Sequence, residues 1–398
     1  HNLGCKVNAY EVEAMQQLLE NAGYETVPFE EGADVYVINT CTVTNIADRK
    51  SRQMLHKAKK MNPDAIVVAT GCYAQADTEK LKEDTAVDLI LGNNQKTQIV
   101  EALEEYEKEH AKQVQVIEIN HTKEYEELSI SSTAEHVRAY IKVQDGCNQF
   151  CTYCIIPFAR GRVRSRKIEE VLSEVETLAA KGYKEVVLTG IHLSSYGVDF
   201  PKEERESLLS LIQAVSRVEG ISRIRLGSLE PRIITEEFLE GIVKTGKVCP
   251  HFHLSLQSGC NKTLKNMNRR YSAQEYAEKC ELIRKFYPAP ALTTDVIVGF
   301  PQETEEDFEE SYEFVKKIHF YETHIFKYSK REGTRAASMP EQVDEQEKTR
   351  RSNIMLEMNA EKMKKYEQLW IGQDVDVLFE EITEKDGARY AVGHTKEY

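Results

Sequence analysis

The 398-residue chain lacks several features, and each absence excludes a class of protein. No apolar run approaches the roughly 18 residues of a membrane-spanning helix, and no signal peptide opens the chain. Its nine cysteines are too scattered for a disulfide framework, which leaves thiols or metal ligands. We therefore expect a cytoplasmic protein without a membrane partner. Because the chain begins at His1 rather than at methionine, we expect its natural start to lie upstream.

Positive charge is also scarce, because 52 Lys and Arg against 66 Asp and Glu give a formal net charge of −14. Phosphates are bound by Lys and Arg, so this balance argues against a nucleic-acid partner. Two segments, residues 155–168 and 259–274, nevertheless contain cations and no acid. Their cations are Arg160, Arg162, Arg164, Arg166, Lys167, Lys262, Lys265, Arg269 and Arg270. Charge alone fits two solvated loops as well as a binding surface.

The N-terminal part alternates short β-branched runs with helical patterns. The runs are residues 34–39 and 65–70, and the helical patterns are at about 10–22, 45–61 and 76–84. This alternation predicts a parallel sheet covered by helices on both faces.

Three cysteines are placed alike in this part of the chain. Cys41 and Cys72 each follow a predicted strand within two residues, and Cys5 would follow a first strand at the missing start. Ligands of open α/β sheets bind outside the carboxyl ends of the strands. The sequence therefore predicts a site where these three thiols meet.

Residues 104–136 are polar and turn-rich and predict a linker, after which a second alternation begins. Its strands are expected near 138–143, 185–190, 222–227, 251–256, 293–298 and 320–326, and its helices near 168–181, 205–218, 234–245, 272–286 and 304–318. Six β/α units are too few for a closed eight-stranded barrel and predict an open, partial barrel whose reactive end is the carboxyl edge of its strands. Both basic segments fall on that edge.

The end of the chain predicts a long charged helix at about 341–369, followed by a β-hairpin. One hairpin cannot form an independent β-domain, so we expect the start of a small C-terminal domain there. The predicted class is α/β in three parts, residues 1–125, 137–369 and 370–398.

The segment DGCNQFCTYCIIPFARG places Cys147, Cys151 and Cys154 in one loop after the first barrel strand. A structural zinc site uses four protein ligands, whereas three cysteines on a four-iron cluster leave one iron open to an exogenous ligand. The alternative is a zinc site whose fourth ligand lies elsewhere in the chain.

A C-x3-C-x2-C loop after the first strand of a partial barrel resembles the radical S-adenosylmethionine superfamily. Further motifs resemble its methylthiotransferase family, namely LTGIHLSSYG, RLGSLEP, HLSLQSGCNKTLKNMNRRY, TDVIVGFPQETEEDF and FKYSKREGTRAASMP, together with the N-terminal cysteines. GCKVNAYE at residues 4–11 is similar to the branch that modifies N6-threonylcarbamoyladenosine in tRNA. The C-terminal hairpin is similar to the start of that family's RNA-binding TRAM domain.

The resemblance implies two [4Fe–4S] clusters, one on Cys147, Cys151 and Cys154 and one on the N-terminal cysteines. The open iron of the first would chelate S-adenosylmethionine, whose one-electron cleavage gives a 5′-deoxyadenosyl radical. The second cluster would carry the sulfur, which is methylated and joined to C2 of the adenine at position 37. The implied partners are the anticodon stem-loop of tRNA and an electron donor such as flavodoxin or ferredoxin.

The resemblance also implies S-adenosylmethionine contacts, and each position has a second interpretation. Tyr153, Thr189, Gly190, Gln257, Ser258, Gly299 and Phe300 are the expected cofactor-binding residues. Thr189 and Gly190 fit a strand-ending turn equally well, and so does Gly299 before Pro301. Arg225 and Glu230 fit a catalytic role or an ion pair.

We expect Arg160, Arg162, Arg164 and Arg166 to contact RNA phosphates, together with Lys262, Lys265, Arg269 and Arg270. Cys249, Cys260 and Cys280 are expected to be structural thiols, and neither His251 nor His253 is expected to bind a metal.

The competing hypotheses are methylthiolation of a ribosomal-protein aspartate or of isopentenyladenosine in tRNA, and a zinc-stabilised RNA-binding module without catalysis.

Overall fold

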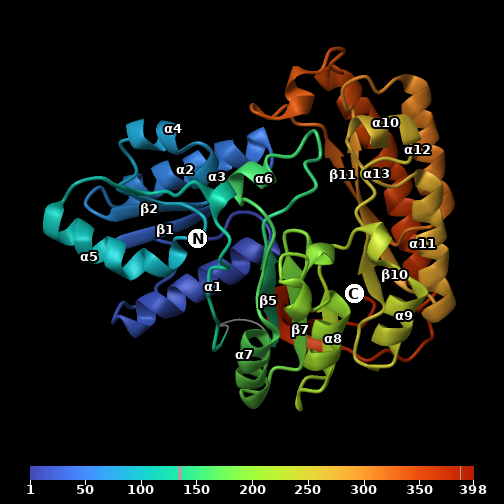
Figure 1. Ribbon diagram of the computed structural model, residues 1–398, viewed down its shortest axis with the longest axis horizontal. Coiled ribbons are helices and arrows are strands. Elements are labelled where there is room, and N and C mark those ends of the chain that lie inside the picture. The colour runs from blue at the N-terminus through green and yellow to red at the C-terminus, as the bar shows by residue number, and fades with distance from the viewer. Residues whose placement is uncertain (133–136, 386) are drawn as a thin grey trace.

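The computed structural model describes residues 1–132, 137–385 and 387–398. An N-terminal parallel sheet with its helices lies on the left of Figure 1, and a curled sheet with outer helices lies on the right. The α/β class predicted from the sequence is confirmed.

The N-terminal sheet has four parallel strands in the order β1-β2-β3-β4. They are β1 (Val35–Thr40), β2 (Ile66–Gly71), β3 (Leu89–Leu91) and β4 (Gln113–Gln115). The helices are α1 (Lys6–Asn21), α2 (Asn45–Met61), α3 (Cys72–Ala76), α4 (Thr78–Glu83) and α5 (Ile99–Glu109). The helix predicted at 76–84 is thus two short helices.

The linker prediction for residues 104–136 is wrong in its first part, because α5 and β4 occupy residues up to 115. The strand β4 has the sequence Gln-Val-Gln at the edge of the sheet, so it carries no apolar run that would mark it. Residues 133–136 of the predicted linker lie outside the described part of the chain.

Apolar side chains cover both faces of this sheet, as expected for buried parallel strands. Ile38, Val67 and Ile90 pack with Leu55 of α2 on one face. On the other face Val68 and Leu89 pack with helices α1 and α5 through Met15, Ile99 and Leu103.

The second sheet is the expected half-barrel, confirmed as six strands that follow one another in chain order. Strands β5 (Arg138–Asp145), β7 (Glu185–Gly190) and β8 (Arg223–Leu226) form one parallel segment, and β9 (His251–His253), β10 (Ala291–Val298) and β11 (Glu322–Lys327) form the other. Parallel bridges from Ile224 to Val248 and from Leu229 to Leu254 join the two segments. A two-residue strand that the sequence did not indicate, β6 (Arg164–Ser165), pairs antiparallel to β5.

Helices cover the outside of the half-barrel, as Figure 1 shows. They are α7 (Ile168–Ala180), α8 (Leu208–Ser216), α9 (Glu236–Val243), α11 (Ala273–Phe286), α12 (Glu305–Ile318) and α13 (Glu345–Gln368). Two short helices, α6 (Ile156–Ala159) and α10 (Asn261–Asn266), lie on loops at the carboxyl edge. Capping boxes begin α11 and α12 at Ser272 and Thr304, which fixes where the loops after β9 and β10 end.

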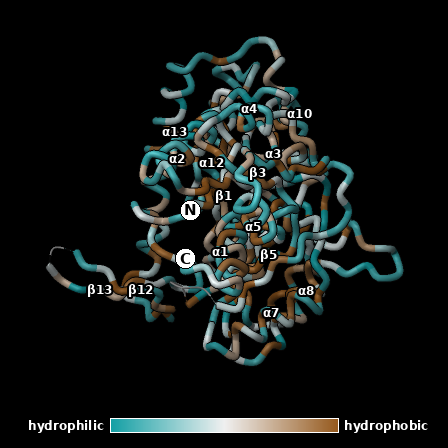
Figure 2. The backbone as a smooth tube through the Cα atoms, turned by 90° about the vertical axis from the view of Figure 1, so that its left-hand side faces the viewer, coloured by the Kyte–Doolittle hydropathy of each residue, from teal (hydrophilic) through white to brown (hydrophobic). Residues whose placement is uncertain are grey.

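The chain ends in the predicted hairpin, formed by β12 (Leu378–Lys385) and β13 (Ala388–His394). Figure 2 shows it projecting from the body of the molecule. Ion pairs from Arg223 to Asp376 and from Arg138 to Glu380 tie its base to the half-barrel. None of the helices in the described part of the chain combines the length and the apolar character needed to span a bilayer.

Candidate functional site

The three N-terminal cysteines come together at the carboxyl edge of their sheet. Cys41 directly follows β1 and Cys72 directly follows β2, and the residues before them, Thr40 and Gly71, are register partners. Cys5 follows residues 1–3, which run beside β1 and bond its backbone, since the Leu3 N–H donates to the Asn39 carbonyl at 3.0 Å. The expected strand before Cys5 is therefore represented by this segment.

Glycines allow this convergence. Gly4 has a φ of +115°, and a Cβ there would lie 3.2 Å from the Cys41 sulfur. Gly71 has a φ of +91°, and a Cβ there would lie 2.2 Å from the Asn39 side chain. Only glycine fits both positions without strain, so the Gly-Cys pairs of the sequence are part of the site's construction.

Cys147, Cys151 and Cys154 lie in a loop that folds back on itself after β5. The Cys147 N–H donates to the Gly161 carbonyl at 3.0 Å, which closes the loop. The Thr152 N–H donates to the Met267 carbonyl at 3.1 Å, and the Thr152 carbonyl accepts from the Ala336 N–H at 2.8 Å. The loop is thus anchored to neighbouring loops of the half-barrel at the same edge.

The thiols within each set affect one another's pKa. Burial and then the neighbouring Cys72 raise the pKa of Cys41 to about 11. Burial and then Cys151 raise the pKa of Cys154 to about 12. Cys41 and Cys154 are therefore protonated at neutral pH, and a metal that binds them as thiolates must displace their protons.

The spacing of the sulfurs bears on which metal group fits. In the described residues, the group of His, Cys, Asp and Glu whose ligand atoms all lie within 4.8 Å of one another is His253, Asp295 and His324. Neither cysteine set is that compact, whereas a tetrahedral zinc ion with Zn–S bonds of about 2.3 Å holds its sulfurs about 3.8 Å apart. The donor type and the wider spacing fit a cluster that presents a separate iron to each sulfur better than they fit one zinc ion.

One arginine donates to a sulfur in each set. Arg160 Nε lies 3.2 Å from Cys72 Sγ, and Arg269 Nη1 lies 3.2 Å from Cys151 Sγ. Hydrogen bonds to cysteine sulfurs are among the features that set the potential of iron–sulfur clusters. The sequence analysis assigned both arginines to RNA, and it gave no signal for these sulfur contacts.

Arg160 is fully buried and joins the two parts of the molecule. Its Nη1 donates to Glu11 Oε1 at 2.8 Å and to Asp145 at 3.2 Å, and its Nη2 donates to Asn8 Oδ1 at 2.7 Å. Burial alone would raise the pKa of Glu11, but Arg160 and Lys142 hold it well below its usual range. The N-terminal sheet is therefore held against the cysteine loop by a buried ionic network.

The structure buries three of the four arginines in residues 160–166 that the sequence assigned to RNA phosphates. Arg160 and Arg164 are fully buried, and Arg166 is buried against Glu174 and Tyr10. Their acidic partners come from distant elements, so inspection of the loop alone could not identify them. Arg162 is exposed, with its guanidinium 4.4 Å from the centre of the Phe150 ring.

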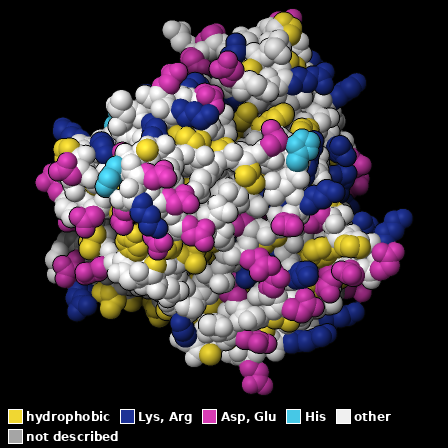
Figure 3. All heavy atoms as spheres, turned by 60° about the vertical axis from the view of Figure 1, so that its left-hand side comes forward, with side chains coloured by type: hydrophobic (Ala, Val, Ile, Leu, Met, Phe, Trp, Pro, Cys, Tyr) yellow, Lys and Arg dark blue, Asp and Glu magenta, His cyan; other side chains and the backbone are white. Residues whose placement is uncertain are grey.

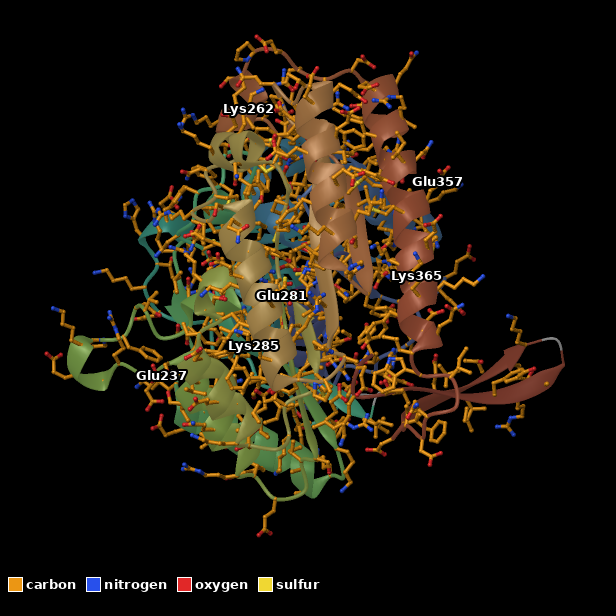
Figure 4. All side chains as sticks on the ribbon, turned by 90° about the vertical axis from the view of Figure 1, so that its right-hand side faces the viewer. Glu237, Lys262, Glu281, Lys285, Glu357 and Lys365 are labelled. Carbon is orange, nitrogen blue, oxygen red and sulfur yellow. The ribbon has the colours of Figure 1, made fainter. Side chains whose placement is uncertain are left out.

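The cations of the second basic segment, residues 259–274, also differ in how exposed they are. Arg269 is half-buried between Cys151 and the Tyr271 ring, whereas Lys265 and Arg270 are exposed beside one surface depression. Lys262 is exposed at the upper rim, where Figure 4 labels it, and pairs with Asp307 at 2.6 Å. Arg162, Lys265 and Arg270 therefore remain the exposed, unpaired cations of the predicted set.

The predicted cofactor residues lie at the carboxyl edge, but some are occupied by protein partners. Gly299 N–H donates to Glu303 at 2.8 Å, and Phe300 is fully buried against Tyr153 and Tyr328. The Phe300 ring thus packs on protein side chains, and contact of Gly299 or Phe300 with S-adenosylmethionine stays a prediction.

Thr189 and Gly190 end β7, opposite Lys142 and Gln144 of β5. Gln257 has a φ of +74°, and its N–H donates to the Asp295 carbonyl. Ser258 is buried and accepts from the Cys260 N–H at 3.2 Å. Contact of these residues and of Tyr153 with S-adenosylmethionine stays a prediction.

Arg225 and Glu230, for which the sequence fits a catalytic role or an ion pair, both form ion pairs. Arg225 bonds Glu185 at 2.8 Å and Glu230 bonds Arg232 at 2.6 Å. Cys249, Cys260 and Cys280 are buried, as expected for structural thiols.

His192 was not singled out from the sequence, although it lies only two residues after the end of β7. Its Nδ1 lies 2.6 Å from Ser195 Oγ, and its buried Nε2 has no partner within the described structure. Burial lowers the pKa of His192 to about 4, so the ring is neutral. An orphaned ring nitrogen at this edge fits a polar ligand bound beside the cysteine loop.

An open cleft of about 1640 Å³ runs between the N-terminal helices and the cysteine loop. Cys151, Cys154 and Phe158 line one side, and Asn45 and Lys80 line the other. The loop after β11 crosses its end, where Arg331 Nη2 donates to Thr42 Oγ1 at 2.7 Å. The cleft thus gives a large ligand access to one cysteine set next to the domain boundary.

Comparisons with known proteins agree with this geometry. Residues 1–92 match the uncharacterized protein family UPF0004, and residues 141–315 match the radical SAM superfamily. The chain is 43% identical to the threonylcarbamoyladenosine tRNA methylthiotransferase MtaB of Bacillus subtilis, over 100% of this chain and 88% of the relative. The MtaB of Aquifex aeolicus is 45% identical over 94% and 91%.

A second type of relative is the tRNA-2-methylthio-N(6)-dimethylallyladenosine synthase of Thermoanaerobacter pseudethanolicus, 38% identical over 96% of this chain and 82% of the relative. Among solved structures, the radical S-adenosylmethionine methyltransferase TsrM of Kitasatospora setae aligns with a TM-score of 0.60 at 15% identity, over 82% of this chain and 71% of that chain. This likeness supports the fold.

Proposed function

Because this chain belongs to the methylthiotransferase family of radical S-adenosylmethionine enzymes, we propose that it adds a methylthio group to C2 of N6-threonylcarbamoyladenosine at position 37 of tRNA. The observation that carries the proposal is the pair of three-cysteine sets, each with an arginine on one sulfur and joined through Arg160. Relatives named for this activity match 94% to 100% of the chain.

We assign a [4Fe–4S] cluster to each cysteine set. Cys147, Cys151 and Cys154 would leave one iron for S-adenosylmethionine, and Cys5, Cys41 and Cys72 would leave one for the transferred sulfur. Bound there, these groups would supply one-electron cleavage of S-adenosylmethionine and a methylated sulfur. The electrons would come from a flavodoxin or a ferredoxin in the cytoplasm.

The chain's own residues would hold the reactants in place. Arg160 and Arg269 direct N–H donors at the ligating sulfurs, and the buried network around Glu11 fixes the two sets relative to each other. Both sets lie at carboxyl edges of parallel strands, where a base that enters the domain boundary could reach them. Positioning of this kind supplies much of an enzyme's rate enhancement.

The test is anaerobic reconstitution, incubation with dithionite, S-adenosylmethionine and tRNA that carries threonylcarbamoyladenosine, and mass spectrometry of the digested nucleosides. A new 2-methylthio derivative of that nucleoside supports the proposal. Formation of 5′-deoxyadenosine without it overturns the substrate, and dimethylallyl-modified tRNA and ribosomal-protein digests then identify the alternative. Protein that takes up zinc and no iron overturns the enzymatic function.

RNA contact by Arg162, Lys265 and Arg270 gives a quantitative prediction. Replacing all three with glutamine should reduce the slope of log affinity against log salt by about 2, since each phosphate contact contributes about 0.7–0.9. Figure 3 shows acidic and basic side chains interspersed on one face of the molecule. Fluorescence anisotropy with tRNA at several salt concentrations measures the slope.

The matched control replaces Lys285, Lys317 and Lys365 with glutamine on the outer helices. Figure 4 labels two of them, Lys285 and Lys365, on the face formed by α11 and α13. This variant has the same net charge as the rim variant and should keep the wild-type slope. Equal slopes for the two variants would remove the rim cations from the RNA interface.

A further inference from the structure

Three side chains of the kind that bind metals meet on the concave face of the half-barrel, outside both cysteine sets. Phe252 of β9 and Val296 of β10 belong to the apolar core under the outer helices. Because side chains alternate along a strand, the residues next to them, His253 and Asp295, point to the opposite, concave face. His324 of β11 is the register partner of Asp295 and lies on the same face. Three adjacent strands thus contribute one potential ligand each.

The three side chains are close enough to share one ion. One ligand atom from each of His253, Asp295 and His324 lies within 4.8 Å of the other two. His253 Nε2 is 3.2 Å from Asp295 Oδ2, and the two imidazole rings stack with their centroids 5.7 Å apart. Nitrogen and oxygen ligands about 2.1 Å from a tetrahedral zinc ion lie about 3.4 Å from one another. Shifts of about 1 Å would therefore place all three ligand atoms on one ion.

The ring of His253 is held as a metal ligand would be. Its Nδ1 lies 2.9 Å from Oγ1 of the buried Thr293, which is its register partner on β10. When Nδ1–H donates to that hydroxyl, the lone pair of Nε2 faces Asp295. Histidines that bind metals almost always use their second ring nitrogen in this way. The same contacts also fit a His–Asp hydrogen bond in which Nε2–H donates to Asp295, so the surrounding charge must distinguish the two interpretations.

The carboxylates at this position lack a lysine or arginine partner among the described residues. Only 27% of the Asp295 side chain is exposed, and its one ion pair is with His253. Glu322 precedes His324 by two residues on the same face of β11, and its one ion pair, at 3.6 Å, is with His324. Arg225 faces the concave side from β8 but is bonded to Glu185. A largely buried carboxylate requires a counter-charge or a metal, and a divalent cation would neutralise both carboxylates at once.

We propose that His253, Asp295 and His324 form a binding site for a divalent transition-metal ion, separate from the two cysteine sets. Two imidazoles and one carboxylate suit Zn²⁺ or Fe²⁺, whereas Mg²⁺ and Ca²⁺ prefer ligand sets made of oxygen. Three protein ligands leave at least one position on the ion for water. The ion bridges β9, β10 and β11 across the concave face. The site does not depend on the function proposed above.

The proposal replaces the expectation from the sequence that His253 binds no metal. Along β9 the sequence shows two histidines and no carboxylate, and Asp295 lies 42 residues further along the chain. Only the register of the three strands brings the ligands together. His251 is not part of the site, because its ring stacks on that of Tyr398 with centroids 4.9 Å apart.

The test uses anaerobically reconstituted protein, in which iron occupies the two cysteine sets. Equilibrium dialysis against buffered Zn²⁺, followed by metal analysis, should find one zinc per chain in addition to the iron. X-ray absorption at the zinc edge should show only nitrogen and oxygen neighbours at about 2.0–2.2 Å, without the sulfur neighbours at about 2.3 Å that cysteine ligands give.

Two variants change the site without disturbing the core. His324 is exposed on the edge strand β11, so His324→Ala should fold normally and lose this zinc. Thr293→Val keeps the size of the side chain and removes only the hydroxyl behind His253. It should weaken zinc binding about 10- to 100-fold, the usual effect of losing a hydrogen bond that orients a ligand.

His56→Ala is the matched control. His56 also pairs with a carboxylate, Asp84 at 2.8 Å, but the two belong to no group of three potential ligands within the described residues. This variant should bind zinc as the wild type does, and a loss of zinc equal to that in His324→Ala would overturn the proposed site.

Three further results would overturn the metal site: wild-type protein that binds no zinc beyond its iron, sulfur neighbours around the bound zinc, or unchanged zinc binding in His324→Ala. Loss of zinc in His324→Ala together with weaker binding in Thr293→Val supports it. None of these results bears on the methylthio transfer, which is measured separately on tRNA nucleosides.

Discussion

Replacing Cys72 with alanine should abolish formation of the methylthio nucleoside while reductive cleavage of S-adenosylmethionine continues. Cys72 belongs to the N-terminal set and lies outside the loop of Cys147, Cys151 and Cys154, so its loss should spare the cluster that binds S-adenosylmethionine. Iron should fall from about eight to about four atoms per chain, the content of one four-iron cluster. Iron analysis, 5′-deoxyadenosine and tRNA nucleosides are measured on the same preparation.

Cys260→Ser is the matched control. Cys260 is buried near Asp307 and belongs to neither set, and serine preserves its size and a hydrogen-bonding group. It should retain the full iron content and the methylthio product. If Cys72→Ala kept all its iron and still formed product, the N-terminal set would have no role in the reaction.

Replacing Arg160 with methionine should destabilise the apo-protein by about 3–5 kcal/mol, the cost of breaking a buried ionic pair. Glu11, Asp145 and Asn8 would each lose a donor without gaining access to water. Chemical unfolding followed by far-UV circular dichroism, with the N-terminal and barrel parts allowed to unfold separately, measures the change.

Arg162→Met is a close control for Arg160→Met, because it removes the same charge two residues away. Its guanidinium is exposed and stacks on Phe150, so the loss should stay near 1 kcal/mol, as for exposed cation–π contacts. Equal effects of the two substitutions would mean that the buried network does not hold the domains together.

Periodicity and the placement of cysteines predicted most of the architecture. The alternation of apolar runs with helical patterns located the half-barrel strands to within a few residues. The N-terminal cysteine set was predicted because its thiols each follow a strand and parallel strands end at one edge. The second set was predicted because its three cysteines share one loop after the first barrel strand. By contrast, β4 carries too little apolar sequence to be recognised.

Roles that depend on distant partners could not be predicted. Arg160 was expected to be a phosphate ligand because its loop contains no acid, yet its partner Glu11 lies 149 residues away in the chain. Sequence locates charge, whereas folding determines which charges are neutralised.

The most direct test of the two-cluster account is Mössbauer spectroscopy of anaerobically reconstituted wild-type protein, combined with analysis of iron and sulfide. The account predicts about eight irons and eight sulfides per chain, all in [4Fe–4S] clusters. About four irons per chain in wild-type protein, or zinc in place of iron, would contradict it.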